Sequence, residues 1–245
     1  MKDYNGLHKL WKRAHEAGSP TKFVRNGVIF RELKKLVPGA TLDAGCGMGE
    51  YSLFLAQNGH EVVAFDPSSF AVNALMGNAG TEFKVEAQIS TIEEFQDSRK
   101  FDNIVSIEVI EHVEFDRAAT QKLYSLLKED GTLVISAPAM NFLFGAADRV
   151  SGHFRRYSYY GFRKILLSAG FKEVSIKSYG FPLLFIYTFM RKFVFERALL
   201  GHFSTTRSNR KFQWSNLSKL YRFALAIDQL NIPRLGIGYV AICKK

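Results

Sequence analysis

Short apolar segments alternate with helical stretches along most of this chain, and this alternation restricts the fold more than any other feature. The segments are continuously apolar, as expected for strands that are buried on both faces of a sheet. Helices between such strands indicate a parallel sheet covered on both sides. We therefore expect an α/β fold with a doubly wound sheet. The expected strands cover residues 41–44, 61–65, 82–85, 103–107, 132–137, 174–179 and 238–243.

A glycine-rich turn follows the first expected strand. The sequence from Leu42 to Glu50 is LDAGCGMGE, with glycines at alternate positions. Glycine permits a sharp turn and lets a ligand approach the backbone, because it has no Cβ. The dinucleotide fingerprint has the different spacing G-x-G-x-x-G, and Asp43 before the turn would repel a pyrophosphate. The turn therefore favours a nucleotide that carries an amino acid with an ammonium group.

An acidic residue ends the second expected strand, in the sequence VVAFDP. At the carboxyl end of such a strand, the Asp66 carboxylate is placed to accept hydrogen bonds from two ribose hydroxyls. The alternative is that Asp66 caps the helix that follows. Its spacing from the glycine turn favours the ribose interpretation.

Four motifs occur in order: LDAGCGMGEYS, VVAFDPS, FDNIVSIEVIEHV and GTLVISAP. Together they resemble the motif set of class I S-adenosylmethionine-dependent methyltransferases, over about residues 40–140. Within this superfamily, the residues of the four motifs resemble those of the small-molecule branch that includes the ubiquinone-biosynthesis O-methyltransferases. The resemblance implies a seven-stranded sheet of order 3-2-1-4-5-7-6 with an antiparallel last strand. It also implies that S-adenosyl-L-methionine is the cofactor.

The resemblance further implies roles in cofactor binding. Asp43, Gly45 and Gly47 would hold the methionine part, Asp66 the ribose, and Pro67 would lie near the adenine. Members of the family often have an aspartate after the third strand, near the adenine amino group. Gln88 stands at that place here, and its side-chain oxygen can accept the same hydrogen bond without charge. The expected cofactor site consists of Asp43, Gly45, Cys46, Gly47, Gly49, Asp66, Pro67, Gln88, Ile89, Ile107 and Glu108.

Two carboxylates and a histidine follow the fourth expected strand, at the edge where open α/β sheets hold their ligands. Three interpretations of Glu108, Glu111 and His112 remain open. In the first, Glu108 and His112 line the cofactor site and Glu111 is a surface or capping group. In the second, His112 is a general base. In the third, all three bind a divalent metal ion, with His153 as a further ligand. The E-x-x-E-H pattern resembles that of metal-dependent 2′-O-methyltransferases acting on small RNAs. A mixed carboxylate and imidazole set suits zinc, manganese or magnesium.

The segment after the fifth expected strand is rich in cations and aromatics, and it precedes a helix that Ser158 would cap. Guanidinium groups bind phosphate or carboxylate in bidentate fashion, and a helix N-terminus attracts anions. We therefore expect Arg155, Arg156 and Tyr157 to bind an anionic group of the acceptor, with His153 as a base or metal ligand. The alternative is that Arg149 pairs with Glu111 or Glu108, that Arg156 pairs with a nearby acidic side chain, and that these pairs only close the site.

Positive charge is concentrated in one part of the chain. The whole sequence carries +10, but residues 149–222 hold 15 Lys and Arg against 2 Asp and Glu. Such a field indicates an anionic substrate, a membrane surface or nucleic acid. We expect one domain, with a helical N-terminal segment at 1–38, a core at 39–180 and 236–245, and a basic, aromatic helical insertion at 181–235. The insertion would cap the acceptor or lie on lipid.

These observations favour a methyltransferase that acts on a small, anionic or lipid-like acceptor, at oxygen. The alternatives are an RNA methyltransferase and a non-catalytic cofactor-binding partner at a membrane. No RNA-binding module is recognisable in the sequence, so nucleic acid is the less favoured partner. Two cysteines, no signal-peptide pattern and no transmembrane run are expected of a cytoplasmic protein, with peripheral membrane contact as a further option.

Overall fold

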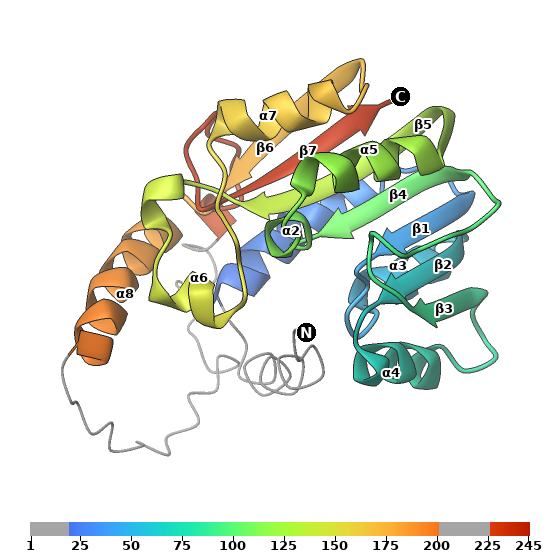
Figure 1. Cartoon of the computed structure of the whole chain (residues 1–245), viewed down its shortest axis with the longest axis horizontal. Coiled ribbons are helices and arrows are strands. Elements are labelled where there is room, and N and C mark those ends of the chain that lie inside the picture. The colour runs from blue at the N-terminus through green and yellow to red at the C-terminus, as the bar shows by residue number, and fades with distance from the viewer. Residues whose placement is uncertain (1–19, 201–225) are drawn as a thin grey trace.

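The computed structural model describes residues 20–200 and 226–245, and its centre is a seven-stranded sheet (Figure 1). The strands lie in the order β3-β2-β1-β4-β5-β7-β6, and β7 is antiparallel to both of its neighbours. The strand order and the fold class are those predicted. The strands are β1 (Ala40–Ala44), β2 (Glu61–Asp66), β3 (Val85–Ile89), β4 (Phe101–Ile107), β5 (Leu127–Pro138), β6 (Glu173–Tyr179) and β7 (Gly238–Lys244).

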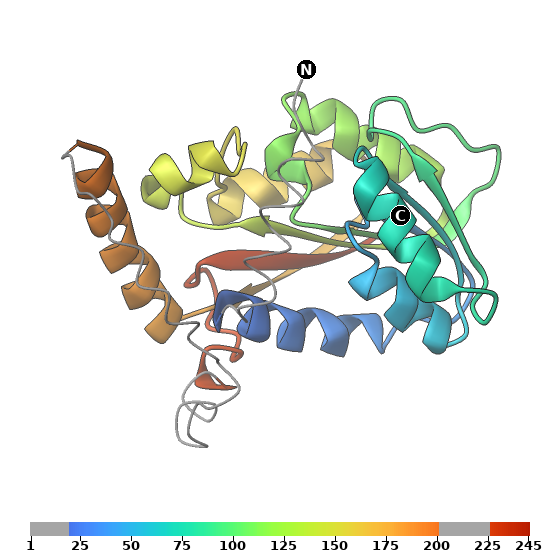
Figure 2. The same cartoon turned by 90° about the horizontal axis from the view of Figure 1, so that it is seen from below.

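Helices cover both faces of the sheet, as Figure 2 shows with α2 below it and α5 above it. Alternate strand residues enter two separate cores: Val62 belongs to the core that includes residues of α2 and α3, and Val63 to the core that includes residues of α5 and α7. Both faces exclude water, which explains why the strands are apolar at consecutive positions. The helices are α2 (Pro20–Leu33), α3 (Glu50–Gln57), α4 (Ser69–Ala79), α5 (Asp116–Leu126), α6 (Ala146–Val150), α7 (Tyr159–Ser168) and α8 (Leu183–Leu200), with short 3₁₀ turns η1 (Ile110–His112) and η2 (Asn141–Leu143).

The strand order reverses between β1 and β4. The chain proceeds outward from β1 to β2 and β3, and then returns to place β4 on the other side of β1. The loops that follow β1 and β4 therefore leave the sheet in opposite directions, at the edge where ligands bind in open α/β sheets. The predicted cofactor residues belong to this edge, because they follow β1, β2 and β4.

The third strand was predicted in the wrong place. It covers Val85–Ile89, three residues later than its predicted start at residue 82. β3 is an edge strand that pairs only with β2, and its partly buried and exposed residues alternate. The prediction relied on continuous apolar character, which an edge strand does not need. Gln88 and Ile89 consequently lie within the strand and not after it.

The segments predicted around the core are only partly within the described residues. α2 confirms the predicted N-terminal helix from Pro20 onward, whereas the predicted Ser19 cap and residues 1–18 lie outside the described parts. α8 confirms helix in the first part of the 181–235 insertion, and residues 201–225 also lie outside. Among the described helices, none has the length and apolar character needed to cross a bilayer.

Candidate active site

The glycine turn after β1 forms a shaped and partly open loop. The backbone N–H groups of Gly45 and Cys46 both donate to the carbonyl of Phe65, at 2.9 and 3.0 Å, which fixes the loop against β2. Gly47 has a φ of 54°, and an added Cβ would have no atom within 4 Å. The backbone there faces open space in a conformation that favours glycine. The loop can therefore receive a ligand at Gly47.

Both predicted cofactor carboxylates lie beside this loop. Asp66 ends β2 and accepts hydrogen bonds from the N–H groups of Gly47 and Ser68, each at 2.9 Å. Asp43 is buried and accepts a 2.6 Å hydrogen bond from Ser52. Burial, helped by the nearby Asp66 charge and opposed by the Ser52 hydrogen bond, raises the pKa of Asp43 to about 7. A bound cation would favour its charged form.

The expected adenine-binding residues lie at the end of β3 and after β2. Ile89 pairs in register with Asp66 and is 60% exposed, so it offers an apolar surface beside the carboxylate. Gln88 is also exposed and pairs with Phe65, and Pro67 is half-buried. The cysteine of the turn, Cys46, is buried, and burial raises the pKa of its thiol. Cys46 is therefore a packed thiol and not a nucleophile.

Glu108 occupies a strained position directly after β4. Its φ of 57° lies in the left-handed region, which is uncommon for a residue other than glycine and is often found at functional sites. Its N–H donates to the hydroxyl of Ser136, and that hydroxyl lies 2.8 Å from Glu108 Oε1. The other carboxylate oxygen lies 3.4 Å from Arg25. These contacts hold the Glu108 side chain between the end of β4 and helix α2.

Arg25 is a site residue that the sequence analysis did not identify. It lies on α2, among buried neighbours that include Tyr51 and Tyr179, and its Nε has no hydrogen-bond partner in the described residues. A guanidinium in such a place can bind a carboxylate. No local motif marks Arg25. The available signal was two adjacent polar residues, Arg25 and Asn26, among the apolar positions of an expected helix.

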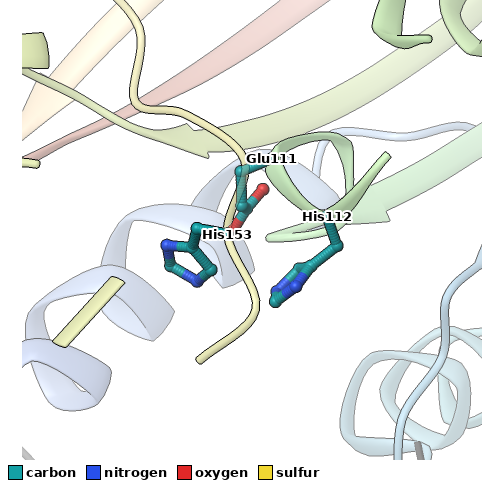
Figure 3. A group of neighbouring side chains, drawn as sticks. All are labelled: Glu111, His112 and His153. Atoms are coloured by element: carbon teal, nitrogen blue, oxygen red, sulfur yellow. The ribbon is translucent and has the colours of Figure 1, made fainter. Parts of the chain in front are cut away.

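Glu111, His112 and His153 converge beyond the end of β4 (Figure 3). One potential ligand atom from each residue lies within 4.8 Å of the others. The rings of the two histidines stand edge to face, with centroids 4.6 Å apart. Glu111 and His112 come from η1, and His153 comes from the segment between α6 and α7. The sequence predicted a group of four, with Glu108 as a further member. Of those four, the structure brings only these three together, because the carboxylate of Glu108 contacts Arg25 and Ser136 instead.

The carboxylate of Glu111 is completely buried and has no hydrogen-bond partner in the described residues. Burial, and then the negative charge of Glu108, raise the pKa of Glu111 well above its ordinary value. Burying an ionised carboxylate without a partner is very costly, so this group is either protonated or compensated by a bound cation. Its position beside two imidazoles is a chemically suitable place for such a cation.

Asp148, on α6, holds His153 in place. Its Oδ1 accepts from His153 Nδ1 at 3.0 Å and from Arg156 Nε at 2.8 Å, and its Oδ2 accepts from the Gly145 N–H. Burial alone would raise the pKa of Asp148, but the hydrogen bonds from His153 and Arg156 hold it at about 2. Asp148 is the second site residue that the sequence analysis did not identify.

The residues predicted to bind an anion already have partners within the protein. Arg155 forms a 2.9 Å ion pair with Asp116, and the buried hydroxyl of Tyr157 lies 3.1 Å from the same carboxylate. Arg156 pairs with Asp148. The contact of Arg156 matches the alternative in which this arginine pairs with a nearby acid, whereas Arg149, expected there to pair with Glu111 or Glu108, lies over the ring of Phe144. Anion binding by the three residues stays a prediction.

Comparison with known proteins gives consistent results. A model of a methyltransferase-domain family matches residues 21–176. A ubiquinone biosynthesis O-methyltransferase from Bradyrhizobium diazoefficiens is 31% identical over 116 residues, which cover 47% of this chain and 45% of the relative. One with the same name from Rickettsia bellii is 33% identical over 136 residues, which cover 53% and 57%. The matches therefore span about half the length of these curated relatives.

The fold is also that of a solved structure. An S-adenosylmethionine-dependent methyltransferase from Mesorhizobium loti superposes with a TM-score of 0.62, over 89% of this chain and 96% of that chain. The two sequences are 13% identical, so this likeness concerns the fold alone.

Proposed function

The chain belongs to the class I S-adenosylmethionine-dependent methyltransferases, and from this we propose that it methylates an oxygen atom of a small anionic or lipid-like acceptor. The observation that carries the proposal is the convergence of Glu111, His112 and His153 at the edge of the sheet that holds the glycine turn. When bound, the cofactor supplies an activated methyl group on a sulfonium. The protein must align the acceptor oxygen and assist the loss of its proton.

The cofactor is a zwitterion at its amino acid end, and the chain offers a group for each charge. We assign the ammonium to Asp43, which is buried beside the turn. We assign the carboxylate to Arg25, whose Nε lacks a partner in the described residues. Asp66 would bind the ribose, because a carboxylate can accept hydrogen bonds beyond those from Gly47 and Ser68. The open backbone at Gly47 leaves room for the ligand.

We further propose that Glu111, His112 and His153 hold a divalent metal ion. Within residues 20–200 and 226–245, neither carboxylate oxygen of Glu111 has a hydrogen-bond partner, which supports this interpretation over simple lining of the site. One carboxylate and two imidazoles form a ligand set that suits zinc or manganese. Held by these three residues, such an ion would supply Lewis-acid assistance to the loss of the acceptor proton. Glu108 would stay with the cofactor, because Arg25 and Ser136 engage its carboxylate.

We propose that α8 borders the acceptor side of the site. Its residue Lys192 donates to the carbonyl of Phe142 in η2 and thereby holds the helix beside that turn. Ile186, Phe189 and Met190 leave 51, 41 and 62% of their surfaces exposed. An apolar face beside basic residues supports an acceptor with an apolar part and peripheral contact with a membrane. A cytoplasmic location with such contact remains our prediction.

The test is methyl transfer with labelled cofactor. The full chain is incubated with methyl-labelled S-adenosylmethionine and a cell extract, and label is counted in the lipid, small-molecule, nucleic-acid and protein fractions. We expect label in the lipid or small-molecule fraction, and none with the Asp66→Ala variant. Label in RNA would instead support the alternative of an RNA methyltransferase. Cofactor binding without label in any fraction would favour a non-catalytic binding protein.

A further inference from the structure

The buried carboxylate of Asp148 has no role in the proposed reaction, yet it makes direct contact with the metal-ligand cluster. It lies on α6, outside the motif set that identifies the family, and is 3% exposed. It accepts three hydrogen bonds, of which one comes from the ring of His153 and one from Arg156. A carboxylate that is desolvated and bonded to a functional imidazole affects how that imidazole is oriented.

The contact determines which ring nitrogen of His153 is available. Asp148 Oδ1 lies 3.0 Å from Nδ1, and an ionised carboxylate can only accept, so Nδ1 must carry the proton. In the neutral ring, Nε2 then holds the lone pair. Figure 3 shows His153 beside Glu111 and His112, which are the residues that Nε2 would join as a ligand. We propose that Asp148 is a positioning residue that fixes the Nδ1–H tautomer and the ring orientation of His153.

Arg156 supports the same arrangement. Its Nε donates to the oxygen of Asp148 that His153 uses, at 2.8 Å, and one terminal nitrogen reaches the carbonyl of Ala139 after β5. The guanidinium thus keeps Asp148 ionised and ties it to the central sheet. Asp148 also accepts from the N–H of Gly145, which fixes the start of α6. The carboxylate therefore has little freedom to leave His153.

This inference rests on the proposed function only for the identity of the bound ion. The tautomer itself is a property of the metal-free protein and can be measured there. Long-range ¹H–¹⁵N correlation spectra of the full chain distinguish Nδ1–H from Nε2–H in a neutral imidazole. We expect His153 to be the Nδ1–H form in the wild type. In Asp148→Asn, whose amide can donate to Nδ1, we expect a substantial fraction of the Nε2–H form.

Zinc binding gives the second readout. Isothermal titration with Zn²⁺ alone should show an affinity about 10- to 100-fold weaker for Asp148→Asn, as is typical when a partner of a ligating histidine is removed. Asp116→Asn is the matched control, because Asp116, on α5, pairs with Arg155 near His153, whereas the hydrogen bond to the His153 ring goes to Asp148. That control should leave both the tautomer and the zinc affinity unchanged, even where it lowers thermal stability.

The outcomes separate the two proposals. A wild-type Nε2–H ring, or an unchanged tautomer in Asp148→Asn, would overturn the role of Asp148 whether or not zinc binds. A wild type with the expected tautomer but without zinc binding would overturn the metal site and leave the positioning role intact. If Asp116→Asn also lost the tautomer preference, the effect would not be specific to the contact between Asp148 and His153. That result would also contradict the proposal.

Discussion

Arg25 reaches across from α2 to the end of β4, where its guanidinium lies 3.4 Å from the carboxylate of Glu108. The N-terminal helix thereby contributes a partly buried cation to the edge of the sheet that is otherwise built from the β1 and β4 loops. Burial alone would lower the pKa of Arg25, but Glu108 and Tyr51 raise it, so the group stays charged. A charge held in this way is available for a ligand carboxylate.

We predict that Arg25→Met weakens binding of S-adenosylhomocysteine about 10- to 100-fold, since a hydrogen bond to a charged group contributes about 1.5–3 kcal/mol. Isothermal titration measures the effect. Arg31→Met is the control, because Arg31 lies on the same helix and bonds the carbonyl of Gln229. An unchanged affinity in Arg25→Met would rule out the assigned role.

Gly45 and Val109 are in tight contact where the two loops separate. A Cβ on Gly45 would collide with the Val109 side chain, and its φ of 83° is unfavourable for other residues. We predict that Gly45→Ala lowers the free energy of unfolding by roughly 1–3 kcal/mol and weakens cofactor binding. Adding Val109→Ala should relieve the collision and restore part of the loss. Denaturant titration gives these values.

The matched control for this pair is Gly77→Ala. Gly77 lies inside α4, and an added Cβ there would meet no atom within 4 Å. Alanine should stabilise that helix by roughly 0.5–1 kcal/mol. If Gly45→Ala changed the free energy of unfolding no more than Gly77→Ala does, the two loops would accommodate an added methyl group, and the predicted collision with Val109 would be wrong.

Asp43 makes the pH dependence of cofactor binding predictable. Its pKa of about 7 exceeds the usual value of about 4. Between these values the folded protein binds a proton that the unfolded chain does not, so raising the pH lowers stability in this window. A ligand ammonium prefers the ionised carboxylate. We therefore expect cofactor affinity to rise from pH 5.5 to 7, with proton release on binding.

Titration calorimetry in buffers of different ionisation enthalpy measures both the affinity and the released proton. Asp43→Asn removes the titrating group and should flatten the profile in this range, with weaker binding throughout. A profile that stays equally steep in Asp43→Asn would assign the pH dependence to another group.

The sequence predicted the parts of the site that are encoded locally. Gly47 lies in the turn after β1 and Asp66 ends β2, so a strand assignment was enough to bring them to the same edge. Glu111 and His112 are adjacent in the chain, and their convergence with His153 was predicted as one of three alternatives. These residues belong to short motifs, and their distance from the ends of the strands determines where they lie.

The residues that escaped prediction act through contacts between distant segments. Arg25 meets Glu108 only because α2 packs against the sheet, and no pattern within the helix specifies that contact. The pairing of Arg155 with Asp116 joins segments about forty residues apart. From sequence alone, a run of cationic residues indicates anion binding, because the acidic side chains that neutralise it within the fold are not visible. The position of β3 was missed because an edge strand alternates in burial.

Removal of metal should distinguish the proposed roles of His112. We predict that His112→Ala lowers methyl transfer by about 10²–10⁴-fold and leaves the affinity for S-adenosylhomocysteine unchanged. If the histidine is a ligand, a chelator should inactivate the wild type, and Zn²⁺ or Mn²⁺ should restore it. Full activity of the wild type in a chelator, together with an inactive His112→Ala, would instead identify His112 as a general base.

The exposed face of α8 provides the last prediction. Ile186 and Met190 lie one turn apart, so both belong to one side of the helix, and 51 and 62% of their surfaces are exposed. Replacing both by glutamate should change the free energy of unfolding by less than about 0.5 kcal/mol per site, as is usual at the surface. It should reduce binding to vesicles that contain phosphatidylglycerol about tenfold or more, because apolar contact is lost and like charges repel.

Vesicle sedimentation at low and high salt measures this effect, since the electrostatic part should weaken as salt is added. Val37→Glu is the control, because Val37 is 78% exposed in the loop before β1 and is not part of α8. If Val37→Glu reduced vesicle binding as strongly as the double variant, the loss would reflect net charge alone. If the double variant bound vesicles normally but raised the KM for a lipid-like acceptor, the face of α8 would serve the substrate and not the membrane.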